Sequence, residues 1–187
     1  DVYFKLFGDI SSAVYENYPK VRLLKPVINK VFRTRKGRTK YIPLRDGEKI
    51  NLGERTLIVK DFPGHTPGSI TLLDPKQKLI YAGDACCMAT WLFTNPGCSV
   101  HTYAETAKNY YRDVKKDGYK KLYGSHVPFP NRISFIKDYA NWVDRLTPEK
   151  AVVKLDIPGM PDKLCIGLKP SLKHLMFGCF YFEHQCD

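Results

Sequence analysis

The sequence predicts a layered domain of the α/β (α+β) class, with helices packed outside a sheet. Between residues 46 and 84, turn signals separate short apolar runs about every ten residues, a spacing typical of antiparallel strands. Two helical patterns follow, and the chain closes on further strands, an order that suits helices layered on a sheet. With 187 residues, the chain is long enough to bury a core. We expect residues 1–187 to form a single domain.

The first 45 residues combine weak secondary-structure signals with a strong basic charge. A strand is expected at Val2–Leu6 and a short helix at Ser11–Tyr18, which Pro19 ends. The segment Lys20–Arg45 holds ten Lys or Arg residues and no Asp or Glu. Residues that favour β-structure flank its central Lys36-Gly37 pair, so this segment is predicted to form a basic hairpin.

Short strands, each bounded by turn residues, are expected after the basic segment. They are placed at Lys49–Leu52, Thr56–Val59, Ser69–Leu73 and Leu79–Ala82. Two or three more strands are expected between residues 151 and 182, where Pro and Gly interrupt the apolar runs.

Helices are expected in the second half of the chain. Thr102 and Glu105 have the spacing of a capping box, which predicts a helix that starts there and runs to about Lys116. Gly118 provides a stop signal just beyond that helix. A second helix is expected over Ser134–Leu146 from its periodic apolar residues.

Three residues of metal-ligand type follow predicted strands. His65 lies in the loop Asp61–Gly68, where two prolines and two glycines surround one imidazole. Asp84 follows an apolar run, and a carboxylate can bind one metal or bridge two. His126 follows a short strand and Gly124. Each has an ordinary alternative as a turn residue, but together they predict a site for zinc, iron or manganese.

The motifs around these residues resemble the second half of the metallo-β-lactamase superfamily. They are the loop Pro63–Ser69 (PGHTPGS), the triplet Gly83-Asp84-Ala85 and the triplet Gly124-Ser125-His126. The segment Leu44–Gly53 resembles the strand and turn that precede the histidine loop in that family. The resemblance implies an αβ/βα sandwich that holds two metals at one sheet edge.

The resemblance also implies a ligand set and a reaction. His65 would bind the first metal, Asp84 would bridge both metals at the catalytic centre, and His126 would complete the second site. The cofactors would be two divalent ions, zinc in the first place, with iron or manganese as alternatives. A hydroxide held between them would attack an ester, thioester, lactone or related small-molecule bond.

One family signature is absent. The motif H-x-H-x-D-H, which supplies the remaining ligands, does not occur in this chain. We therefore interpret residues 1–187 as the carboxy-terminal portion of a longer enzyme, and expect them to be inactive alone and prone to self-association. The rival interpretation is a degenerate homologue that has lost its metals.

Charge and hydropathy restrict the expected partners. The net charge of +11 favours anionic partners, such as a small acidic substrate or a nucleic acid. The basic segment 20–45 allows two alternatives, a nuclease acting on RNA or DNA and a metal-free binding module; it can also be a solvated hairpin. No run of eighteen apolar residues is present, so no membrane partner is expected. We expect a cytoplasmic protein, with a lost signal peptide as the alternative.

Other residues of chemical interest have less support. The six cysteines form no C-x-x-C pair and are expected to be mostly reduced and buried, with disulfides as the alternative. Cys86 and Cys87 are expected to contact the site from behind rather than bind metal. Trp91 and Phe93 are equally compatible with a pocket wall and with the core. A structural zinc is disfavoured for the remaining metal-capable side chains of the tail, which are Cys165, His174, Cys179, His184 and Cys186.

Overall fold

The structure is a computed structural model that describes residues 42–93, 98–125, 130–156, 162–170 and 176–186. The expected strand Val2–Leu6, the expected helix Ser11–Tyr18 and most of the basic hairpin lie outside these ranges. Residues 42–45 are irregular and exposed. Among the described residues, no helix is both long and apolar enough to cross a bilayer. The fold described below is that of the unit Leu44–Asp187.

The larger sheet has six strands in the order β1-β2-β3-β4-β6-β7. Its strands span Lys49–Asn51 (β1), Thr56–Asp61 (β2), Ile70–Asp74 (β3), Leu79–Gly83 (β4), Lys121–Gly124 (β6) and Asn131–Arg132 (β7). The strands expected from the turn signals are therefore confirmed, with ends that shift by a residue or two. Glycines with positive φ make two of the turns, Gly47 at +78° and Gly53 at +85°.

Strand direction decides where the loops emerge. Strands β2 and β4 are both antiparallel to β3, so they run the same way. Strand β6 is parallel to β4. The carboxyl ends of β2, β4 and β6 therefore lie at one edge of the sheet, and the loops that follow them emerge together.

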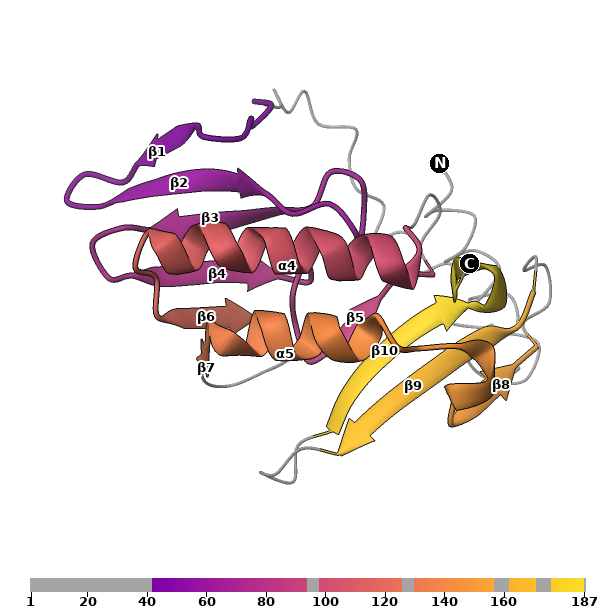
Figure 1. The fold of residues 1–187 in the computed structure, drawn as a ribbon. Coiled ribbons are helices and arrows are strands. Elements are labelled where there is room, and N and C mark those ends of the chain that lie inside the picture. Colours follow the sequence, from indigo (N-terminus) through magenta and orange to yellow (C-terminus); the bar gives the residue numbers. More distant parts are fainter. Residues whose placement is uncertain (1–41, 94–97, 126–129, 157–161, 171–175, 187) are drawn as a thin grey trace, which may run out of the picture. The chain divides into compact units, whose positions relative to one another are not determined.

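Two helices cover one face of this sheet, side by side (Figure 1). They are α4 (Val100–Lys116) and α5 (Ser134–Val143). Fully buried residues of the helices pack against Ile80 and Leu122 of the sheet in one apolar core. The α/β class of the chain is confirmed by this layered arrangement.

The predicted start of the first helix is wrong by three residues. The N-cap is Ser99, whose side chain accepts a hydrogen bond from the backbone N–H of Thr102 at 3.1 Å. Thr102 therefore lies inside the helix, and its hydroxyl pairs with that of Ser99 at 3.0 Å. Ser99 and Thr102 are both suitable N-cap residues, and the spacing between Thr102 and Glu105 led to the prediction of Thr102 as the N-cap. The predicted end at Lys116 is confirmed.

A second sheet has four strands in the order β5-β10-β9-β8. They span Ala89–Trp91 (β5), Met176–Phe182 (β10), Leu164–Pro170 (β9) and Val153–Leu155 (β8), with 3₁₀ turns at Pro148–Lys150 (η1) and Glu183–Cys186 (η2). The strands expected in the tail are thus confirmed, whereas the sequence predicted no strand at residues 89–91. They form a strand because they pair in parallel with β10, nearly ninety residues later.

Tyr139 ties this sheet to α5. Its buried hydroxyl donates to the carbonyl of Gly178 in β10 at 2.6 Å and accepts from the N–H of Thr90 in β5 at 3.2 Å. Because both partners are backbone groups of neighbouring strands, one side chain fixes the helix to two strands at once. Because this buried hydroxyl both donates and accepts a hydrogen bond, the protein does not incur the free-energy penalty of an unsatisfied buried polar group.

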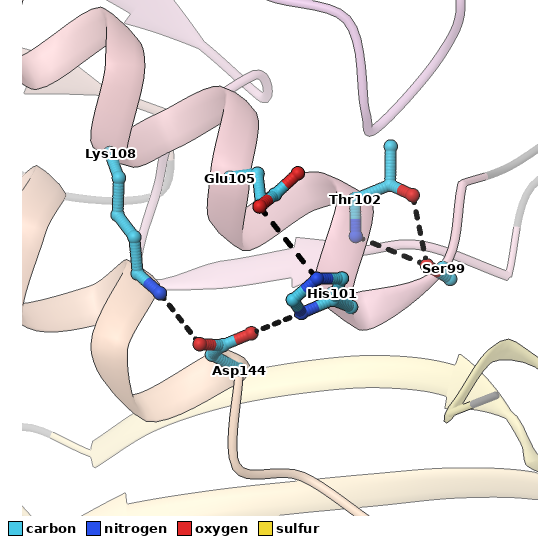
Figure 2. A network of polar contacts seen from close by, with 6 residues as sticks. All are labelled: Ser99, His101, Thr102, Glu105, Lys108 and Asp144. Atoms are coloured by element: carbon cyan, nitrogen blue, oxygen red, sulfur yellow. Dashed lines mark hydrogen bonds and ion pairs between the residues drawn. The ribbon is translucent and has the colours of Figure 1, made fainter.

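A polar network joins the start of α4 to the end of α5 (Figure 2). Asp144 accepts from Lys108 Nζ at 2.6 Å and lies 2.7 Å from His101 Nδ1. His101 Nε2 in turn lies 3.8 Å from Glu105. The hydrogen bond from Lys108, followed by that from His101, lowers the pKa of the Asp144 carboxyl.

We predict that Asp144→Asn lowers the free energy of unfolding by about 0.5–1 kcal/mol at pH 7. A carboxyl whose folded pKa is depressed stabilises the fold above its ordinary pKa of 3.8, and this contribution is lost as the pH falls through the lower folded value. Urea unfolding at pH 7 and pH 3 should therefore show a difference at pH 7 that shrinks at pH 3. Asp138→Asn, on the exposed side of the same helix, is the control. An equal loss for Asp144→Asn at both pH values would contradict this prediction.

Candidate metal centre

Two of the three predicted ligands lie in described residues, and both follow strands that end at the same sheet edge. His65 follows β2 and Asp84 follows β4 directly. His126 lies outside the described residues. Its neighbour Ser125 follows β6 and donates from its backbone N–H to the carbonyl of Gly83 at 2.9 Å. The chain segments that carry Asp84 and Ser125 thus leave the sheet as paired neighbours.

The imidazole of His65 is hydrogen-bonded to a backbone carbonyl. Its Nδ1 lies 2.6 Å from the carbonyl oxygen of Trp91, at the end of β5. A carbonyl oxygen accepts only, so Nδ1 must carry the proton. In the neutral ring this places the lone pair on Nε2, the arrangement by which a backbone carbonyl orients a metal-binding histidine.

The loop that carries His65 is held by its own backbone. Phe62 N–H donates to the carbonyl of Ser69 at 2.9 Å, and Gly64 N–H donates to that of Thr66 at 3.1 Å. Ser69 Oγ also accepts from Thr66 N–H at 2.9 Å. At the base of the loop, the fully buried ring of Phe62 meets Tyr110 edge-on at 4.7 Å. These contacts hold the backbone of the loop that carries His65.

Tyr103 connects the His65 loop to the Asp84 turn. Its fully buried ring packs so closely on Gly64 that a Cβ there would lie 2.6 Å from the Tyr103 Cδ2 atom. Its hydroxyl donates to the carbonyl of Ala85 at 3.0 Å. One side chain of α4 therefore contacts the neighbour of each described candidate ligand. The sequence analysis did not identify this role, because a close approach between a helix and a loop leaves no local sequence signal.

Asp84 is exposed in the turn that follows β4. The turn is closed by a hydrogen bond from the N–H of Ala85 to the carbonyl of Ala82 at 3.0 Å. Within the ranges that the structure describes, no three His, Cys, Asp or Glu side chains are grouped closely enough to hold a metal. The three-residue ligand set therefore stays a prediction, and the structure contributes the common sheet edge and the orientation of His65.

The cysteines beside Asp84 are buried thiols. Burial raises the pKa of both Cys86 and Cys87, so these side chains stay protonated at neutral pH. Burial also raises the pKa of Cys98 to about 11, and its thiol lies 3.5 Å from the carbonyl of Gly64. Metal binding requires a thiolate, so these residues are better suited to packing behind the site.

The metal-capable residues of the tail are separated. Cys165 and Cys179 are fully buried in the core, and the six cysteines, all within the described residues, form no disulfide. His184 Nδ1 lies 2.8 Å from the Asp162 carboxylate. His174 lies outside the described residues.

Comparison with known proteins identifies the family. The profile of the metallo-beta-lactamase superfamily matches residues 10–126. This range covers more than half of the chain, which therefore belongs to the metallo-beta-lactamase superfamily.

Relatives with a named activity match a shorter stretch. The acyl-coenzyme A thioesterase MBLAC2 of Homo sapiens and that of Bos taurus are each 32% identical over 83 residues, and that of Gallus gallus is 33% identical over 86 residues. The matched stretch is 44% of this chain and 30% of each relative. The chain thus spans less than a third of the length of these thioesterases.

Solved structures of the superfamily also match. A metallo-beta-lactamase family protein from Thermus thermophilus is 16% identical with a TM-score of 0.47, covering 75% of this chain and 52% of that protein. A metallo-beta-lactamase from Pontibacter korlensis is 14% identical with a TM-score of 0.46, covering 64% of this chain and 54% of that protein.

We predict that Gly124→Ala lowers the free energy of unfolding by about 1–3 kcal/mol. A Cβ at this position would lie 2.6 Å from the carbonyl oxygen of Cys86 and 3.0 Å from the Cα of Cys87, and backbone atoms cannot rotate away. The matched control is Gly68→Ala, where no atom lies within 4 Å of the new Cβ. The measurement is the urea midpoint of unfolding, which should be lower for Gly124→Ala than for Gly68→Ala. Equal midpoints for the two variants would show that β6 does not pack closely on the segment after Asp84.

Proposed function

We propose that this chain carries part of the metal centre of a thioester hydrolase. The observation that carries the proposal is the bond from His65 Nδ1–H to the Trp91 carbonyl, which presents Nε2 as the ligand atom. Membership of the superfamily supports a metal-dependent hydrolase, and the partial similarity to acyl-coenzyme A thioesterases supports the thioester among the bonds considered.

The donor set fits divalent metal ions. A neutral imidazole, an exposed carboxylate and a second imidazole would come from His65, Asp84 and His126, and such nitrogen and oxygen donors suit zinc, iron or manganese. Bound ions of this kind would polarise the thioester carbonyl and make water a better nucleophile at neutral pH.

The protein's own groups act by positioning. The Trp91 carbonyl holds the proton of His65 on Nδ1, so the ring keeps one tautomer and one orientation. Tyr103 holds the turn after Asp84 through its bond to Ala85, and its ring packs against Gly64 in the His65 loop. Because both contacts come from one buried side chain, the spacing between the two candidate ligand segments resists thermal displacement.

The positive charge of the chain is compatible with this substrate class. Coenzyme A carries several phosphate groups, and a net charge of +11 attracts polyanions over long range. The same charge supports a second candidate function, a superfamily nuclease that grips RNA or DNA through segment 20–45. Nucleic-acid affinity that falls steeply with salt, together with cleavage, would favour this second candidate.

We predict that His65→Ala and Asp84→Asn in the full-length protein each reduce the amount of bound metal and lower kcat/KM for acyl-coenzyme A by at least about 100-fold. Loss of a group that only orients a metal ligand already costs up to about 100-fold, and loss of the ligand itself should cost at least as much. Elemental analysis and thioester hydrolysis measure the two effects. The controls are His101→Gln and Asp138→Asn, which replace the same residue types on the two helices. Full metal content and full activity in either site variant would refute the assignment.

A further inference from the structure

One face of the four-stranded sheet is apolar from edge to edge. Cross-strand partners form a first row that consists of Trp91 (β5), Phe180 (β10), Ile166 (β9) and Val153 (β8). A second row consists of Phe182, Leu164 and Leu155. Partners in register lie on the same side of a sheet, so these seven side chains share one face.

This face points away from the helices. Residues of the opposite parity, such as Thr90, Cys179 and Tyr181, are fully buried on the helix side, whereas Leu164 and Phe182 are the buried members of the outer face. Three of the apolar side chains remain well exposed, with accessible fractions of 45% for Trp91, 39% for Val153 and 44% for Leu155. Large apolar side chains gathered on one face, rather than scattered singly, indicate a binding surface.

The β5 end of this face is aromatic. The Trp91 ring lies 5.3 Å from that of Phe93 and 5.8 Å from that of Phe180. Phe93 in turn meets Phe182 edge-on at 6.1 Å between ring centroids, and Phe182 is buried. Rings held against one another lose little freedom when a ligand covers them.

The aromatic end is continuous with the candidate metal centre through a single residue. Trp91 holds His65 by its backbone carbonyl and contributes its indole ring to the aromatic surface. A substrate whose reacting bond is at the metal centre therefore has an apolar surface within reach of the groups attached to that bond.

We propose, on the basis of the proposed function, that Trp91, Phe93 and Phe180 bind the hydrocarbon chain of the acyl group. The chemistry that recognises this ligand is the burial of methylene groups against aromatic faces, which is worth about fourfold in affinity for each methylene. The surface therefore selects long acyl chains over short ones.

Acyl-chain selectivity in the full-length protein is the first test. The ratio of kcat/KM for dodecanoyl-coenzyme A to that for butanoyl-coenzyme A should fall at least tenfold in Trp91→Ala, which keeps the backbone carbonyl that holds His65. Phe93→Ala, made separately, should lower the ratio in the same direction. The control is Val152→Ser, an exposed apolar residue next to the far edge strand β8. An unchanged ratio in both aromatic variants overturns the proposal.

Binding without catalysis separates this inference from the proposed function. Calorimetry with dodecanoate, below its micelle concentration, should show saturable binding to the wild-type protein and to Val152→Ser. Trp91→Ala should bind dodecanoate at least tenfold more weakly. The wild-type protein should show no binding of butanoate. Such binding without thioester hydrolysis supports the apolar site and contradicts the proposed reaction. Absent dodecanoate binding overturns the inference. A third outcome also overturns the inference: the wild-type protein self-associates, Trp91→Ala abolishes this self-association, and dodecanoate does not bind. In that case the apolar face is the contact with a second copy of the chain.

Discussion

The hydrogen bond from His65 Nδ1–H to the Trp91 carbonyl is the constraint on which the candidate site depends. It joins the loop after β2 to the end of β5, two segments that belong to different sheets. The bond selects the tautomer of an imidazole, and the tautomer decides which nitrogen can bind a cation. The bond therefore links the fold to the chemistry proposed for the site, because moving β5 would turn the ring.

Buried tyrosines carry the rest of the connection between the layers. Tyr103 and Tyr139 reach from the helices to backbone groups of the strands and turns beneath them. Tyr110 pairs with the hydroxyl of Thr71 at 2.6 Å in the same core. Burial raises the pKa of all three tyrosines, which keeps them neutral donors at any physiological pH. Satisfied hydroxyls in an apolar core favour one arrangement of helices over the sheet, because a shifted helix would leave them unpaired.

Local signals predicted most of the elements that were described. Turn residues located strands β1 to β4 of the larger sheet, capping spacing located α4 and apolar periodicity located α5, because these features depend on neighbouring residues. The N-cap was assigned to Thr102 instead of Ser99 because two hydroxyl residues competed for one position. Strand β5 was missed because its pairing partner lies far along the chain, and three residues carry too little pattern to reveal it.

The residue types of the candidate site were evident from sequence motifs, whereas its contacts were not. Pro and Gly around His65, and Gly before Asp84, predicted loops at strand ends. The role of Trp91 depends on its backbone oxygen, which no side-chain pattern reports. The role of Tyr103 depends on a close approach to Gly64, which requires the helix and the loop to be placed in three dimensions.

The tautomer of His65 tests this account most directly. Long-range ¹H–¹⁵N correlation spectra of the full-length protein, without metal and after titration with zinc, report which ring nitrogen carries the proton. The account predicts a protonated Nδ1 in both states and a zinc-dependent shift of the unprotonated Nε2. A proton on Nε2 in the metal-free protein, or zinc bound at Nδ1, would contradict it.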